Sequence, residues 1–264
     1  MKLGFGLYRH QLDAEHFDFA RQCGATHVIV HLCDYFNKAG TRHSDGNQPV
    51  GDTSEGWGDA RGSDDPIWTL GGLQALKEEI ESHDLKIWAI ENFDPGMWYD
   101  ILLDGPTKEE QMAGLQALIR NVGKVGIPVF GYNFSIAGVS SREIGPVARG
   151  NANSVYMRSV DDTPIPKGMI WNMRYDGGAS DGELPYFSHE ELWQRLEWFL
   201  KNLVPVAEES GVRLAAHPDD PPMPVVRNSP RLVYQPHMYQ DLLNIVPSRH
   251  NALEFCLGTI AEMS

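Results

Sequence analysis

The 264-residue sequence predicts an α/β fold, a (β/α)8 TIM barrel of which about six β/α units are present in this chain. Three observations predict it. Amphipathic helical stretches alternate with short β-rich runs, no G-x-G-x-x-G motif follows the first strand, and polar residues gather at the ends of the predicted strands. We expect a single domain over 1–264, with loop inserts at about 35–66 and 135–187 that cover the active-site face.

The first half of the chain predicts three strands and the two helices between them. GFGLY near the start is the first strand. A helix is expected to begin at Asp13, end near Gly24 and lead into the second strand, HVIVH. The next helix runs from about Leu70 to Ser82 with apolar residues on one face, and it leads into KIWAIEN.

The second half predicts two further helices, each begun by a Ser/Thr-x-x-Glu capping box and each ended by a glycine. The boxes are Thr107 with Glu110, and Ser188 with Glu191. VFGYNF and RLAAHP follow these helices as the fourth and fifth strands, and ALEFCLGT near the end contains the sixth. Strict alternation of helix and strand implies that the strands are parallel.

Composition and charge limit the function. The chain is 42% hydrophobic with a formal net charge of -14, which disfavours nucleic acid and anionic membranes as partners. There is no apolar run of about 18 residues, and the first residues lack a signal peptide, so we expect a cytoplasmic protein. Cys23, Cys33 and Cys256 have no C-x-x-C spacing and are expected to be reduced, with Cys23 in a helix core.

Polar side chains recur at the carboxyl ends of the predicted strands. They are His31, Glu91, Asn133, His217 and Cys256. In a barrel all these ends meet at one mouth, where active sites lie. We expect His31, Glu91 and Asn133 to bind substrate, and Asp219 and Arg174 to join them from loops. A hydrogen-bonded structural role stays open for His31, and a packing role for Glu91 and Asn133.

His217 and Cys256 are the candidate metal ligands. Pro218 favours an extended conformation for the residue before it, which fits His217 as the last residue of a strand. Cys256 is expected at the end of the neighbouring strand, and neighbouring strands lie about 5 Å apart, so the two side chains can share one ion. For at least one of Asp219 and Asp220, capping of backbone groups in a Pro-rich turn is the alternative.

At this point the sequence resembles the mannonate dehydratase family. The resemblance rests on HPDDPP after a strand, VPVAEESGVRLA before it, CLGT one unit later, LKEEIE before the third strand and GYNF at the fourth. It covers about Leu70 to Met263. Leu257 departs from the family, which usually has Thr at that position, and the segment after GYNF is divergent.

The resemblance implies an enzyme of hexuronate catabolism, a hydro-lyase that converts D-mannonate to 2-keto-3-deoxy-D-gluconate and water. It implies a divalent metal, Mn2+ or Fe2+, and it matches His217 and Cys256 to two of the family's metal ligands. The family's remaining ligands and its acid and base residues are expected on later units, beyond Ser264, so the catalytic residues stay unknown and the chain is expected to be a fragment. A homo-oligomer is compatible with the sequence.

Two other functions stay open. One is a sugar isomerase or epimerase on a barrel of the xylose-isomerase type, which would act on neutral aldoses or ketoses. The other is a non-catalytic, truncated relative that binds a sugar acid without turnover.

Overall fold

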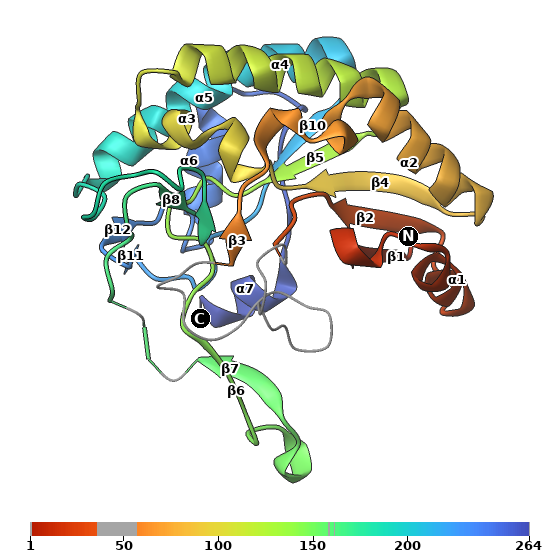
Figure 1. Ribbon diagram of the computed structural model, residues 1–264, viewed down its shortest axis with the longest axis horizontal. Coiled ribbons are helices and arrows are strands. Elements are labelled where there is room, and N and C mark those ends of the chain that lie inside the picture. The colour runs from red at the N-terminus through yellow and green to blue at the C-terminus, as the bar shows by residue number, and fades with distance from the viewer. Residues whose placement is uncertain (1, 36–56, 158, 161, 264) are drawn as a thin grey trace.

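The structure is a computed structural model that describes residues 2–35, 57–157, 159–160 and 162–263. Six parallel strands form one curved sheet in the order β1-β2-β4-β5-β10-β13 (Figure 1). Their bounds are Gly4–Tyr8, His27–His31, Lys86–Glu91, Val129–Tyr132, Arg213–Ala216 and Asn251–Leu253. The six predicted strands are therefore confirmed, and they lie in the sheet in the same order as in the sequence.

Helices connect the successive strands of the main sheet, and the last helix follows β13. They are α1 (Ala14–Gln22), α2 (Leu70–Ser82), α3 (Tyr99–Leu103), α4 (Lys108–Val125), α5 (His189–Ser210), α6 (Met238–Ile245) and α7 (Leu257–Glu262). Figure 1 shows α2, α4 and α5 along the outside of the sheet. Their buried apolar residues recur at helical spacing, so the predicted amphipathic stripes form the outer layer of the core.

The predicted helix starts have different outcomes. The capping box of α5 is confirmed, because the Ser188 hydroxyl accepts a hydrogen bond from the Glu191 backbone N–H and the Glu191 carboxylate accepts one from Ser188 N–H. The predicted box at Thr107 is wrong. The Thr107 hydroxyl donates instead to Asp100 Oδ2 at 2.5 Å, which ties the start of α4 to α3.

The main sheet has the arrangement of six strands of a barrel. Within the described residues it does not close, because β1 and β13 do not pair with each other. β1 pairs with β2, β13 pairs with β10, and neither edge strand has a second partner in the described ranges. The α/β class and the barrel-like order of the strands are as predicted. The carboxyl ends of all six strands lie along the same edge of the sheet, because every pairing in it is parallel.

The two predicted inserts meet in a small sheet. β3 (Gly58–Asp59), from the first insert, pairs in parallel with β9 (Met173–Arg174), from the second, and β9 pairs with β8 (Met169–Ile170). Positions 36–56 of the first insert lie outside the described residues. The second insert also forms a hairpin of β6 (Arg142–Gly145) and β7 (Ser154–Met157), which projects from the body in Figure 1. A third hairpin follows β10, with strands β11 (Val225–Val226) and β12 (Ser229–Pro230).

Two further observations bear on the sequence-based expectations. Among the described residues, every helix is too short or too polar to cross a lipid bilayer. Cys23 is exposed, so its predicted place in a helix core is wrong. It follows the last residue of α1 as the C-cap, and the buried face of that helix is formed by Phe17 and Ala20 instead.

Candidate metal centre

His31 and Glu91 lie side by side at the carboxyl ends of β2 and β4. They are the last residues of these strands and are direct partners in the parallel register. His31 Nε2 lies 3.3 Å from Glu91 Oε2. Asn133 and His217 each follow the last residue of their strand, β5 and β10, so the predicted gathering of polar side chains at one edge is observed.

Cys256 does not lie at the end of β13, and that part of the prediction is wrong. The strand ends at Leu253, and Cys256 is the N-cap of α7. The Glu254 N–H still donates to Ala216 O of β10, but the Cys256 N–H donates to Glu254 O, so the chain turns away from the sheet after Glu254. Glu254 therefore occupies the strand-end position that the sequence analysis assigned to Cys256.

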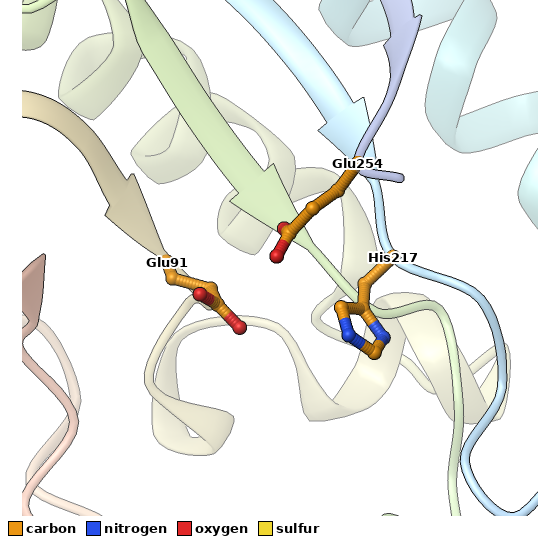
Figure 2. A group of neighbouring side chains, drawn as sticks. All are labelled: Glu91, His217 and Glu254. Atoms are coloured by element: carbon orange, nitrogen blue, oxygen red, sulfur yellow. The ribbon is translucent and has the colours of Figure 1, made fainter. Parts of the chain in front are cut away.

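Three side chains converge at this edge. One ligand atom from each of Glu91, His217 and Glu254 lies within 4.8 Å of the other two. Figure 2 shows the two carboxylates and the imidazole directed toward a common space from β4, from the end of β13 and from the end of β10. The arrangement offers one nitrogen and two oxygen donors, a set that suits a divalent cation.

The imidazole of His217 is held in one orientation by its own turn. Its Nδ1 lies 2.6 Å from the backbone oxygen of Pro218. A carbonyl oxygen only accepts, so Nδ1 carries the proton and Nε2 is left as the ligand atom. Metal-binding histidines are commonly oriented by such a second hydrogen bond.

Cys256 contacts the same imidazole. The hydrogen bond with His217 is the main reason why the pKa of the Cys256 thiol falls to about 7, and a hydrogen bond from Thr259 Oγ1, 3.2 Å from Sγ, acts in the same direction. Burial opposes charge on His217, yet the hydrogen bond with Cys256 and the charges of Glu254 and Glu91 raise the pKa of His217 to about 9. The two shifts favour an imidazolium beside a partly ionised thiol at neutral pH.

Burial and mutual repulsion act on the two carboxylates. Burial raises the pKa of Glu91, and burial together with the charge of Glu91 raises the pKa of Glu254 to about 7. Two carboxylates this close favour a proton or a cation between them, and the positive charge of His217 acts on both in the opposite direction to burial. The residues present thus fit a divalent metal ion.

His31 adds a neutral imidazole beside this group. Burial lowers its pKa to about 4, so it is uncharged at pH 7. Its ring stacks on Tyr8 with centroids 4.4 Å apart, and its buried Nδ1 has no hydrogen-bond partner among the described residues. An uncharged ring with an unused nitrogen can donate to or accept from a substrate hydroxyl.

The other predicted substrate-binding residues have different surroundings. Asn133 Nδ2 donates to Pro218 O at 3.2 Å, while its buried Oδ1 has no partner in the described chain. The Asp219 carboxylate accepts from Arg231 at 2.9 Å and from two backbone N–H groups, which agrees with the backbone-capping alternative. Arg174 lies in β9, in the insert sheet rather than at the end of a main-sheet strand.

Aromatic rings connect the strand-end residues to the second insert. Tyr8, which stacks on His31, lies 6.1 Å from the ring of Tyr35. Tyr35 in turn lies 5.7 Å from Trp171 and 5.8 Å from Trp57. Trp171 is therefore buried in a packed aromatic group that joins both inserts to the edge of the site.

Glu254 is the site residue that the sequence analysis missed. The segment ALEFCLGT predicts a strand that continues to its cysteine, and in such a strand the glutamate is an interior residue. One signal was available. In both strands a glutamate directly follows two apolar residues: Glu254 follows Ala-Leu, and Glu91 follows Ala-Ile.

A family model described as D-mannonate dehydratase (UxuA) matches residues 43–143 and 184–264, more than half of the chain. The mannonate dehydratase of Streptococcus pneumoniae (strain 70585) is 31% identical over 209 residues, which is 74% of this chain and 56% of that protein. The mannonate dehydratase of Lactococcus lactis subsp. cremoris (strain MG1363) is 30% identical over 216 residues, with 74% and 59% covered. The chain thus spans less than two thirds of the length of these curated relatives.

The same similarity extends to three dimensions. The crystal structure of mannonate dehydratase from Streptococcus suis serotype 2 superposes with a TM-score of 0.71 at 26% sequence identity. The alignment covers 99% of this chain and 64% of that one. The fold described above is therefore shared along nearly the whole chain.

Proposed function

The chain belongs to the D-mannonate dehydratase family, and we propose that it carries the metal-binding part of an enzyme that dehydrates D-mannonate to 2-keto-3-deoxy-D-gluconate. The reaction class is that of a hydro-lyase in hexuronate catabolism. Because the chain spans 56% of its first relative, its own turnover is part of the proposal.

One observation supports the proposal most directly. His217, in the HPDDPP segment, presents Nε2 to the strand-end space while Pro218 O holds Nδ1, and Cys256 contacts the same ring. We propose that His217 and Cys256 bind a divalent metal, Mn2+ or Fe2+. The lowered pKa of the Cys256 thiol favours the thiolate that binds a metal, and a bound metal would displace the proton from Nε2 of His217.

In the proposed reaction, side chains of this chain orient the substrate while a bound ion stabilises negative charge. Removal of the proton next to a carboxylate requires stabilisation of the negative charge that develops, and a bound divalent ion would supply positive charge there. Neutral His31 and Asn133 Oδ1, which has no hydrogen-bond partner within the described ranges, are suited to orient sugar hydroxyls by hydrogen bonds. Buried aromatic packing behind them keeps water away from that side of the substrate.

The proposed substrate is a small sugar acid, and the net charge of -14 argues against nucleic acid as an alternative partner. The proposed compartment is the cytoplasm. It is supported by three cysteines that are all free among the described residues, which is typical of a reducing compartment.

The test is a turnover assay with D-mannonate and added Mn2+ that measures 2-keto-3-deoxy acid, on protein whose intact mass is checked in the same sample. We expect product with the unmodified chain and none with His217→Ala. The control is His237→Ala, an exposed histidine before α6, which should behave like the unmodified protein.

Two outcomes would contradict the proposal. Conversion of a neutral aldose or ketose, without action on hexonates, would favour the isomerase or epimerase alternative. Tight binding of D-mannonate without any product would identify a non-catalytic relative.

A further inference from the structure

We propose that the amino ends of β1, β2 and β4 form a binding site for a phosphate monoester with a flat apolar body. This end of the sheet is opposite to the candidate metal centre, because the strands are parallel and that centre lies at their carboxyl ends. A cavity of about 560 Å³ lies there. It is lined by Lys2, His27, Lys86 and Trp88, and by residues from the end of α2 and from the turns before β4 and β5.

Two nitrogen-bearing side chains begin neighbouring strands. His27 is the first residue of β2, Lys86 is the first residue of β4, and the two are direct partners in the parallel register. Neighbouring strands lie about 5 Å apart, so one anionic group can contact both side chains. On the other side of His27 the partner is Gly4 of β1, which has no side chain to fill the space beside the imidazole.

Trp88 reaches this cavity through an irregularity in the strand pairing. Ile87 pairs with Val28. Ala89, two positions later in β4, pairs with Ile29, the next residue of β2. Trp88 is therefore an extra residue of β4 that has no partner in β2. Bulges of this kind change the direction of a side chain and are frequent beside binding sites.

The indole of Trp88 contacts two of the other lining residues. Lys2 Nζ lies 3.3 Å from the centre of the ring, which is a cation–π contact. The imidazole of His27 lies edge-on to the same indole, with the ring centres 5.5 Å apart. Because Trp88 holds the ammonium group of Lys2 in place, an anion that binds there costs less side-chain entropy than at a free lysine.

The cavity has an excess of positive charge, although the chain has 36 acidic and 22 basic residues. Within the described ranges, Lys2 and Lys86 have no ion pair with an acidic residue. Glu81 and Asp84 also line the cavity, but Glu81 lies 3.9 Å from Lys77 of the same helix. Two unpaired ammonium groups then face a single acidic residue, Asp84, so the cavity attracts anions.

His27 can add a hydrogen bond without adding charge. Burial lowers the pKa of His27, and the charges of Lys2 and Lys86 lower it further, so the imidazole is neutral at pH 7. Thr26 Oγ1 lies 2.8 Å from Nδ1 of the ring. A hydroxyl that donates to Nδ1 leaves the ring proton on Nε2, from which it can be donated to an anion.

The lining predicts a ligand with two parts. A phosphate monoester carries a charge of about −1.5 to −2 at pH 7, which matches two ammonium groups better than a single carboxylate does. Ile87, Ile127 and Pro128 join Trp88 in the lining and supply apolar surface. A flat apolar body attached to the phosphate would pack against this surface.

The experiment is a titration of the purified chain with phenyl phosphate, followed by the line width of its phosphorus NMR signal. We expect saturable binding, and we expect Lys86→Met to weaken it about tenfold, because the charge is lost while the apolar stem is kept. Lys2→Met should act in the same direction. The matched control is Lys124→Met, at an exposed position on α4, which should bind like the unmodified chain. Circular dichroism checks that each variant is folded.

Three further comparisons test the ligand and the place. Inorganic phosphate, which lacks the ring, and benzoate, which has one charge, should both bind more weakly than phenyl phosphate. His217→Ala should bind phenyl phosphate like the unmodified chain, because this histidine lies at the other end of the sheet. Equal affinity in Lys86→Met and the unmodified chain would overturn the inference. An equal loss in Lys124→Met, a loss in His217→Ala, or equal affinity for the three anions would also overturn it.

Discussion

The guanidinium of Arg231 donates to the carboxylate of Asp219 across 2.9 Å, and both side chains are almost completely buried. The same guanidinium donates to Ser135 Oγ and to the backbone oxygen of Gly138. The pair therefore connects the segment after His217 to the start of the second insert. Asp219 holds the turn that orients His217. The presence of Asp219 in the HPDDPP segment therefore has a structural reason.

Removing one partner of this pair should be strongly destabilising. Asp219→Asn leaves a buried guanidinium without its counter-charge, and we expect the free energy of unfolding to fall by about 3–5 kcal/mol. The control is Asp104→Asn, which removes the exposed pair with Lys108 and should cost about 0–1 kcal/mol. Urea denaturation of both variants measures the difference. Equal stability of the two would contradict the role given to Asp219.

Two glycines of α4 should respond in opposite directions to alanine. A Cβ atom at Gly114 meets nothing within 4 Å, so Gly114→Ala should stabilise the protein by about 0.5–1 kcal/mol through helix propensity. A Cβ atom at Gly123 would lie 2.3 Å from the backbone oxygen of Ser210 on α5. Gly123→Ala should therefore destabilise by about 1–3 kcal/mol despite the same gain in propensity. The melting temperature of each variant measures these effects. A higher melting temperature for Gly123→Ala would show that α4 and α5 are not packed this closely.

Cys256 and Cys33 should differ in alkylation when no metal is added. The pKa of Cys256 is lowered to about 7, so its thiolate fraction and its rate with iodoacetamide should rise through half of the maximum near pH 7. Burial raises the pKa of Cys33 well above its usual value, and this thiol should stay unmodified in the folded protein.

Mass spectrometry of tryptic peptides reads each site separately. His217→Ala removes the hydrogen bond that is the main cause of the low pKa, so the midpoint for Cys256 should move to higher pH in that variant. An unchanged midpoint would mean that the imidazole does not activate the thiol.

The bidentate pair of Arg9 and Asp65 should contribute to stability only above acidic pH. Burial opposes charge on Asp65, but the hydrogen bonds and charge of Arg9 lower the pKa of its carboxyl in the folded protein. A lowered folded-state pKa gives stability that is present above the unfolded value of about 3.9 and is lost as the pH falls through the folded value.

Asp65→Asn provides the comparison, because Asn can still accept the hydrogen bond from Ile67 N–H that caps the following turn. The difference in melting temperature between this variant and the unmodified protein should be constant from pH 7 to pH 5 and should shrink below about pH 4. A difference that stays the same down to pH 2.5 would assign the effect to packing rather than to the ion pair.

Local chemistry explains why most of the fold could be predicted. Apolar spacing in α4 and α5, the capping box at Ser188 and the glycine ends of helices act within a few residues, so they are readable without the fold. The Thr107 box failed because Asp100, seven residues earlier, competes for the hydroxyl once α3 packs against α4. The Ser/Thr-x-x-Glu pattern takes no account of a competing acceptor such as Asp100 from another helix.

The sequence by itself determined the α/β class, the order of six strands and the placement of His31, Glu91 and His217 at strand ends, because periodicity and the residue before a proline are local constraints. Only the tertiary structure decided that β13 stops at Leu253, that Glu254 rather than Cys256 faces Glu91, and that Asp219 pairs with Arg231. Each of these depends on where neighbouring strands and inserts bring backbone and charge together. Distances of that kind are set by packing between segments far apart in the chain.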